Sequence, residues 1–375
     1  LSCSPGHPEP SALPAASAWQ PAPQAFSSQV TILALTAGVG GQPWVAVGSA
    51  VGLDGQPSTA CFLSYDARSW TACRLAPVDL DGNHTRLLSV GRLGSTLVAG
   101  GVAVGALHGN PRPTLWRADP GQPLAELNLP RELFGGERII SFDGLATGPL
   151  GGFAVGTWDG VTNQAVAQVW RTTDGGDWQR LDGVTSMTST SEELLRGSAV
   201  AVGPHHVVVV GAALHLHRLA DGDEGAIWWS DDGRTWHRAN PNGARLTGPG
   251  NQELSVVAAA GDGFVAGGSD SGAAALWWSP DGASWHWGAL PAAAGPHARV
   301  TAVTSAAGRQ WAAGVVNGVP RVWSSTDGNH WTLEPLPAGT PPTGVQSITM
   351  GAGDGELVMV VQGPEGPRTS VASIR

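Results

Sequence analysis

The sequence predicts an all-β fold, a seven-bladed β-propeller whose blades are four-stranded antiparallel sheets. A short turn phrase recurs along the chain at a spacing of about one blade, and four strand-like runs accompany each copy. Repeats of this length are typical of a closed ring of small sheets. The composition agrees, because 54 glycines and 28 prolines suit a fold with many tight turns.

The recurring phrase has the form S-x-D-G-x-x-W. Its nearly complete copies are 172–178, 230–236, 279–285 and 325–331. Residues 64–70 form a further copy with Ala in place of Gly, and Asp119 belongs to a sixth copy that has lost most of the motif. An Asp side chain accepts bonds from the N–H groups of its own turn, Gly supplies positive φ, and the closing Trp buries a large apolar surface. Each copy is therefore predicted to form the turn of a β-hairpin.

These residues resemble the Asp-box, also called the bacterial neuraminidase repeat, over roughly residues 60–331. The resemblance implies a β-propeller, since proteins with this repeat include sialidases, other glycosidases, sortilin-like receptors and a photosystem II assembly factor. Asp-boxes lie at hairpin turns on the rim of the propeller. We therefore assign their residues a structural role and no chemistry.

The blades can be counted from the strand-like runs. Quartets of strands are expected to begin near Val30, Arg86, Arg138, Ser198, Leu254, Val300 and Ser347. The last unit has only three strands, so residues 17–20 are predicted to supply the fourth and close the ring, which removes exposed sheet edges. Six blades are the alternative if residues 1–28 do not pair. The only helical segment expected is a single turn at 191–196.

The chain contains three cysteines. Cys61 and Cys73 flank the first turn phrase, at a spacing that places them opposite each other in a hairpin and predicts a disulfide. Such a bridge indicates an oxidising compartment. Two buried thiols are the alternative.

Cys3 stands in the sequence Leu1-Ser2-Cys3-Ser4, which resembles the end of a bacterial lipoprotein signal. The resemblance implies that Cys3 is lipidated and that the protein is extracytoplasmic, either secreted or anchored to the membrane. Residues 1–16 are expected to form a flexible linker rich in Pro, Ala and Ser, and residues 17–375 a single propeller domain. A free thiol is the alternative for Cys3.

A ligand-binding face is predicted where the loops lead into the innermost strands and join the second strand of each blade to the third. These loops are long in the first half of the chain, and long loops often carry function. Four arginines precede or begin inner strands, namely Arg86, Arg138, Arg196 and Arg299. Facing the mouth of the central channel, they would bind a carboxylate, sulfate or phosphate group. The same half of the ring carries Glu137, Trp158 and Asp159. The structural alternative is that these arginines pair with acids of the loops.

Sialidase chemistry is disfavoured at the nucleophile. Those enzymes bind their substrate's carboxylate with an arginine triad but use a Tyr–Glu pair, and the only tyrosine here, Tyr65, lies in a rim turn. Glycoside hydrolysis needs two carboxyl groups across one cleft. Loop acids such as Glu137, Asp143 and Asp159 are available, although their spacing singles out no pair. No catalytic residue is assigned.

Two candidate metal sites are visible. His215 and His217 would point two imidazoles to one face of a strand, but no third ligand has a convincing spacing, and a solvated loop is the alternative. The other candidate is a calcium site. Asp79, Asp81 and Asn83 place three oxygen ligands at alternate positions, as calcium loops do. Gly82 is out of place for such a loop, and no bidentate Glu closes it, so an ordinary turn is the alternative. No other cofactor is expected.

The sequence as a whole favours a non-catalytic extracellular binding module, tethered to the cell envelope, for a partner protein or a glycan. A glycosidase acting on an anionic sugar is the alternative. The net charge of −10 without a basic cluster disfavours nucleic acid as a partner. We expect the protein to be a monomer that contacts the membrane only through the lipid on Cys3.

Overall fold

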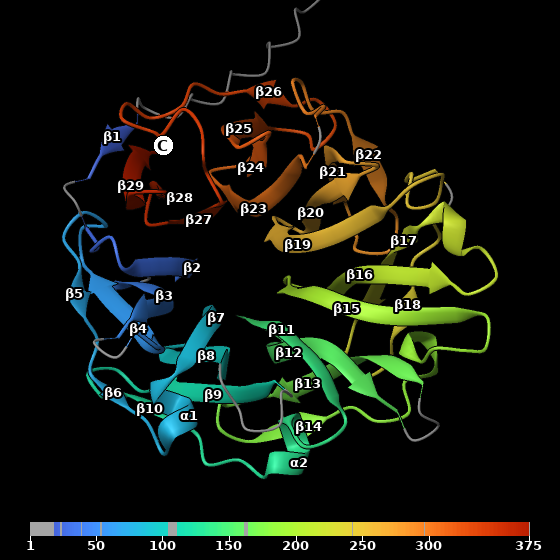
Figure 1. The fold of residues 1–375 in the computed structure, drawn as a ribbon, viewed down its shortest axis with the longest axis horizontal. Coiled ribbons are helices and arrows are strands. Elements are labelled where there is room, and N and C mark those ends of the chain that lie inside the picture. Colours follow the sequence, from blue (N-terminus) through green and yellow to red (C-terminus); the bar gives the residue numbers. More distant parts are fainter. Residues whose placement is uncertain are drawn as a thin grey trace, which may run out of the picture.

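Seven small sheets form a closed ring around one axis (Figure 1). The structure, a computed structural model, describes residues 19–22, 25–38, 40–52, 55–103, 111–160, 164–241, 243–295 and 297–374. The predicted seven-bladed propeller is confirmed, and so is its closure. Strand β1 (Gln20–Pro21) pairs antiparallel with β29 (Gly366–Ser373) and completes the last blade.

Each blade is an antiparallel meander whose first strand lies nearest the axis (Figure 1). The first blade contains β2 (Val30–Thr36), β3 (Trp44–Val51), β4 (Pro57–Ser64) and β5 (Thr71–Ala72). The second contains β7 (Thr85–Leu93), β8 (Thr96–Ala103), β9 (Arg112–Ala118) and β10 (Leu124–Glu126). The third contains β11 (Ile139–Gly148), β12 (Gly151–Asp159), β13 (Ala165–Thr172) and β14 (Trp178–Arg180).

The remaining four blades repeat this order. The fourth contains β15 (Glu193–Val202), β16 (Val207–His215), β17 (Asp223–Ser230) and β18 (His237–Arg238). The fifth contains β19 (Gln252–Ala260), β20 (Gly263–Asp270), β21 (Ala273–Ser279) and β22 (His286–Gly288). The sixth contains β23 (Arg299–Ala306), β24 (Arg309–Val316), β25 (Val319–Ser325) and β26 (Thr332–Leu333). The seventh contains β27 (Ser347–Gly353), β28 (Glu356–Gly363), β29 and β1.

A disulfide fixes the connection between the first two blades. Cys61 on β4 and Cys73 after β5 are bonded, with their Cα atoms 5.2 Å apart, which confirms the predicted pairing. The chain then crosses to the second blade, where β6 (Leu75–Ala76) pairs in parallel with β10. The second blade thus has five strands, a feature that the sequence did not predict.

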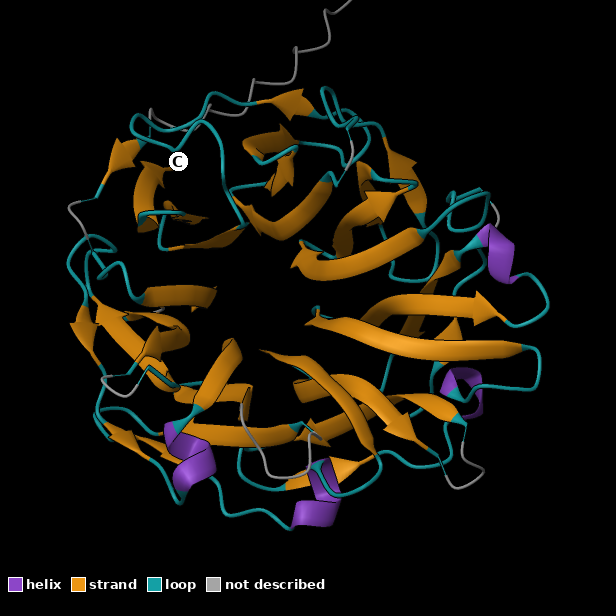
Figure 2. Ribbon diagram, viewed as in Figure 1, coloured by secondary structure: helices purple, strands orange, loops and turns teal. Residues whose placement is uncertain are grey.

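Short helical turns lie at the periphery of the ring (Figure 2). They are α1 (Leu80–Asn83), α2 (Arg131–Phe134), η1 (Thr185–Met187) and η2 (Leu219–Asp221). The helical turn expected at 191–196 is wrong, because residues from Glu193 onward belong to β15, which pairs with β16 starting at His215. Within the described residues, no helix is long and apolar enough to cross a membrane.

The acidic hairpin turns have the predicted local chemistry. In the fourth blade, the Asp232 carboxylate accepts the backbone N–H groups of Thr235 and Arg234, each at 2.7 Å, and the Ser230 hydroxyl at 3.0 Å. These bonds, led by the one from Thr235, lower the pKa of Asp232 to about 2. The closing indole donates within its own turn elsewhere, as Trp331 Nε1 does to the Gly328 oxygen at 2.8 Å.

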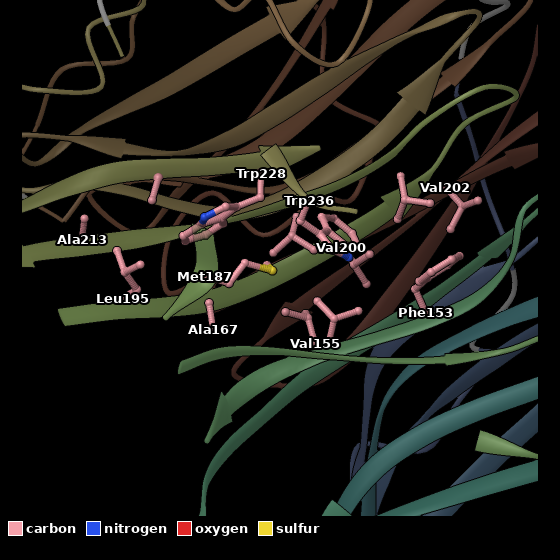
Figure 3. Close-up of a cluster of buried hydrophobic side chains, with 14 residues drawn as sticks. Phe153, Val155, Ala167, Met187, Leu195, Val200, Val202, Ala213, Trp228 and Trp236 are labelled. Atoms are coloured by element: carbon pink, nitrogen blue, oxygen red, sulfur yellow. The ribbon is translucent and has the colours of Figure 1, made fainter. Parts of the chain in front are cut away.

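The core lies between neighbouring blades. Figure 3 shows one such cluster, where Phe153 and Val155 of β12 face Val200 and Val202 of β15, with Trp236 nearby. Phe153 is fully buried and Trp236 is 5% exposed. Because each turn tryptophan packs against the sheet of the preceding blade, the repeated turns fix the spacing of the blades.

Candidate ligand-binding face

The loops are unequal on the face where inner strands begin. In the first four blades the second strand ends at residue 51, 103, 159 or 215 and the third begins at residue 57, 112, 165 or 223. In the last three blades only residues 271–272, 317–318 and 364–365 separate these strands. All the helical turns except η2 precede inner strands of blades two to four, on the same face. One side of this face is therefore elaborated, as the sequence predicted.

A repeated backbone device sets the positions of the residues nearest the axis on this face. The inner strands of blades one to six each contain a β-bulge, and the residue before it pairs with a glycine of the second strand. The glycines are Gly48, Gly101, Gly156, Gly211, Gly268 and Gly314. A Cβ on any of them would overlap a carbonyl oxygen of the inner strand. The glycine therefore admits the bulged strand.

In each of these blades the carbonyl oxygen that the Cβ would overlap belongs to the residue just before the glycine's pairing partner. These residues occupy equivalent positions in the inner strands, and we call them the axial ring. In the seventh blade, β27 has no bulge, Val361 replaces the glycine, and Ser347 occupies the equivalent position. The axial ring consists of Thr31, Arg86, Ser141, Arg196, Glu253, Arg299 and Ser347. Arginine therefore stands in blades two, four and six, and all seven residues are polar.

The four charged side chains of the axial ring face solvent, whereas Thr31, Ser141 and Ser347 are partly buried. Arg86, Arg196, Arg299 and Glu253 are exposed, whereas residues on either side of them along the strand are buried. Leu87 and Val300, for example, are fully buried between blades. The side chains of these four residues therefore lie outside the core between blades. Three predicted ligand-binding arginines thus occupy equivalent exposed positions around the axis.

Arg196 is linked to two carboxylates. It forms an ion pair with Asp223 at the start of β17, and its charge also acts on Asp143 of the neighbouring blade. Asp143 is the bulged residue of β11, and its carboxylate accepts a hydrogen bond from the Ser141 hydroxyl at 2.6 Å. Asp143 is partly open to solvent, but the surrounding blades limit the hydration of its carboxylate and raise its pKa to about 6. The hydrogen bond from Ser141 and the charge of Arg196 act in the opposite direction.

The fourth predicted arginine lies outside the axial ring. Arg138 precedes β11 and donates through its guanidinium to the Asp159 carbonyl at 3.4 Å, while Asp159 N–H donates to the Arg138 carbonyl at 2.7 Å. Trp158 lies in the core between blades, 6% exposed, with the Arg180 guanidinium 4.5 Å from its ring centroid. These residues are neighbours in the third blade, but their side chains do not gather at one point.

Glu137 lines a separate groove. This groove, of about 560 Å³, lies on the second blade beside the connection to the third. Its lining includes Leu127, Leu129, Pro113 and Glu126. Burial raises the pKa of Glu126, which accepts the Val78 N–H at 2.7 Å.

The candidate calcium residues have partners within the protein. Asp79 is the N-cap of α1, where its carboxylate accepts the N–H groups of Asp81 and Gly82. Asp81 forms an ion pair with Arg112 at 2.6 Å, and the Asn83 amide donates to the Asp79 carbonyl at 3.0 Å. No group of three or more His, Cys, Asp or Glu side chains suited to a metal ion occurs in the described part of the chain. Cys3, the predicted lipidation site, lies outside the described residues.

The sequence predicted only some of the residues in and around the axial ring. Arg86, Arg196 and Arg299 were assigned to the site, but Ser141 and Asp223 were not. The pairing of Ser141 with Asp143 depends on the bulge, which shifts the register by one residue. The signal that could have located the bulges is the glycine that recurs near the middle of the second strands, because each of these glycines lies opposite a bulge of the inner strand.

Comparison with known proteins identifies the fold alone. No protein-family model matches the chain, and no curated protein matches it. Among solved structures, the β-propeller domain of the Trilobed protease from Pyrococcus furiosus is similar with a TM-score of 0.54 and 11% identity, over 91% of this chain and 94% of that one. A protein from Lactobacillus plantarum gives 0.50 and 12%, over 86% and 93%.

The Trypanosoma rangeli sialidase is similar with a TM-score of 0.44 and 13% identity, over 95% of this chain and 54% of that one. A shared propeller does not specify a function, which has to be argued from the site.

Proposed function

We propose that the protein is a non-catalytic extracellular binding module of the Asp-box class. In this proposal the axial ring holds an anionic group of a partner protein or a glycan. The observation that carries the proposal is the placement of Arg86, Arg196 and Arg299 at equivalent exposed positions around one axis. Guanidinium groups bind carboxylate, sulfate and phosphate through paired hydrogen bonds. The long loops of blades one to four would supply the rest of the contact surface.

The test is to replace the three arginines with glutamine, one at a time and together. Binding to a panel of carboxylated and sulfated glycans, and cross-linking to proteins of the native cell envelope, should weaken with each replacement and be lost in the triple variant. Arg234→Gln is the matched control, since Arg234 is exposed in the hairpin turn of blade four. Equal binding by the triple variant and the wild type would remove the axial ring from the interface.

We also propose that Cys3 carries a lipid that tethers the propeller to the cell envelope. The sequence around Cys3 and the disulfide between Cys61 and Cys73 support an extracytoplasmic location. Cys3→Ala should move the full-length protein from the membrane fraction to the soluble fraction. Unchanged partitioning would contradict the tether and leave the binding proposal standing.

A second candidate function is glycoside hydrolysis on an anionic sugar. The observation that favours it is Asp143, a carboxyl group with a pKa raised to about 6 close to the axis and to Arg196. Turnover of fluorogenic glycosides that disappears in Asp143→Asn, Glu137→Gln or Asp159→Asn would support this function over a binding module. If the protein binds these glycosides but hydrolyses none of them, glycoside hydrolysis is contradicted.

A further inference from the structure

The hairpin turn of the second blade lacks the tryptophan that closes the same turn in blades one and three to six. Leu124 lies two residues before Glu126, which pairs with Trp116 of β9. In the fourth blade Trp236 lies two residues before the residue that pairs with the equivalent Trp228. Leu124 therefore occupies the position of a turn tryptophan, where it is 2% exposed.

The second-blade turn also stands clear of the blade before it. In blades three to six, a Cβ added to the turn glycine would lie between 2.3 and 3.2 Å from a side chain of the preceding blade. These glycines are Gly175, Gly233, Gly282 and Gly328. The equivalent Gly121 has the same backbone conformation, with φ of 77°, but a Cβ there would meet no atom within 4 Å. The space that a turn and its indole fill elsewhere is therefore open between the first two blades.

A cavity of about 470 Å³ occupies this space. Val45 and Leu63 of the first blade and Leu97 and Leu124 of the second form its apolar walls. Tyr65 also lines it and is 81% exposed, so an aromatic ring stands at the mouth. The cavity lies where inner strands end, on the face opposite the axial ring. Its volume is in the range of sites for small molecules.

Arg74 takes over the hydrogen bond that a turn indole makes elsewhere. In the sixth blade Trp331 Nε1 donates to the Gly328 carbonyl at 2.8 Å. In the second blade the equivalent Gly121 carbonyl accepts from the Arg74 guanidinium at 2.7 Å. The cavity is thus bordered by a cation where the other blades have a neutral ring.

A second guanidinium lines the cavity and is held by neutral groups. Arg92 donates to two backbone carbonyl oxygens, at 3.3 and 2.6 Å, and to the side-chain oxygen of Gln42. The acid in the lining, Asp119, is already paired with Arg117 at 2.9 Å. Within the described residues, no carboxylate forms an ion pair with Arg74 or Arg92. Both positive charges therefore remain available to an anion.

These walls and charges specify one class of ligand. A flat aromatic ring suits the cavity because an indole fills the equivalent space in other blades, and a guanidinium can also stack on such a ring. We infer that the cavity binds a small aromatic carboxylate, with its ring between Leu63 and Leu97 and its carboxylate toward Arg74 and Arg92. This site lies on the other face of the propeller and does not depend on the proposed function of the axial ring.

The test is a calorimetric titration of indoleacetate into the full chain. Leu124→Trp restores the turn tryptophan and should abolish binding, while its denaturant unfolding midpoint stays at or above that of the wild type. Arg74→Gln should weaken binding about tenfold, since a charge-assisted hydrogen bond is lost. The control is Arg234→Gln, an exposed arginine in the turn of the fourth blade, which should bind indoleacetate as the wild type does.

Two further ligands separate the ring from the charge. Indole lacks the carboxylate and cyclohexylacetate lacks the aromatic ring, so each should bind about tenfold more weakly than indoleacetate. Indole binding as tightly as indoleacetate would overturn the role of the arginines.

The remaining outcomes decide whether the site exists and what occupies it. Absence of indoleacetate binding to the wild type, or binding that is unchanged in Leu124→Trp, would overturn the site. N-acetyltryptophanamide binding more tightly than indoleacetate would assign the cavity to a tryptophan side chain of a partner protein and overturn the small carboxylate. Joint replacement of Arg86, Arg196 and Arg299 by glutamine should leave indoleacetate binding unchanged, so failure of the axial-ring proposal is distinguishable from failure of this one.

Discussion

Gly211→Ala should destabilise the protein strongly, although alanine suits a strand better than glycine. Gly211 lies on β16 opposite Gly197, and its φ is not positive, so the backbone conformation itself accepts an alanine. The obstacle is the bulge of β15. The new Cβ would overlap the Arg196 carbonyl oxygen and lie 3.0 Å from the carbonyl carbon and from the Cα of Gly197. All three atoms are backbone, so no side-chain rotation can relieve the overlap.

The magnitude follows from what must move. Where alanine replaces glycine without strain, it stabilises a protein by about 0.4–1 kcal/mol by reducing the entropy of the unfolded chain. Overpacking in a closely packed region costs about 1–3 kcal/mol, occasionally more. Here the inner strand itself must shift, which also weakens a ladder hydrogen bond that contributes about 1 kcal/mol. We expect a net loss of about 3 kcal/mol in the free energy of unfolding, opposite in sign to the effect at an open position.

The assay is denaturant unfolding followed by tryptophan fluorescence. Gly176→Ala is the matched control, because its Cβ would meet no atom nearer than 3.6 Å and its φ is not positive. The control should leave the free energy of unfolding unchanged or raise it by up to about 1 kcal/mol. If Gly211→Ala is as stable as Gly176→Ala, the glycine does not admit the bulge, and the argument that positions the axial ring is wrong.

Three further predictions concern the turns, the disulfide and the axial ring. Asp232→Asn should lower the free energy of unfolding by about 1 kcal/mol or less at neutral pH, since the turn is exposed; the loss should shrink as the pH falls from 3.8 toward about 2, because the depressed pKa makes this contribution disappear as Asp232 is protonated. Joint replacement of Cys61 and Cys73 by alanine should cost about 2–3 kcal/mol in denaturant unfolding, and both wild-type cysteines should resist alkylation before reduction. Ser141→Ala removes the hydrogen bond that favours ionised Asp143, so carboxyl ¹³C titration should give a pKa above about 6. An unchanged or lower value would contradict that contact.

The features predicted correctly from the sequence are those that local chemistry determines. The acidic turns, the blade count and the closure by residues near Trp19 follow from patterns a few residues long that repeat around the ring. The bond between Cys61 and Cys73 follows from a single hairpin. The wrong helical turn at 191–196 is equally instructive, because Leu194 and Leu195 fit a helix locally but extend a strand when β16 lies beside them.

Features that leave no repeated pattern in the sequence were missed for a physical reason. The parallel pairing of β6 with β10 joins two short segments that lie far apart in the chain, and such short pairings carry no periodic signal. The bulges change the register by one residue and so decide which side chains face the axis. Arg138 was grouped with the other arginines because the extra register shift after Ile139 is not visible in the sequence.

The bulge and its glycine also explain how one fold can carry a changeable binding surface. The carbonyl of each axial-ring residue in blades one to six is held by backbone packing against a glycine, whereas the side chains of the four charged members are exposed and contribute little to the core between blades. The free energy of unfolding should therefore depend little on which residue stands at these four positions, since exposed substitutions away from special features change it by less than about 0.5 kcal/mol. Blades two, four and six carry arginine where blades one, three and seven carry hydroxyl groups. The propeller thus separates the residues that build the ring from those that determine its charge.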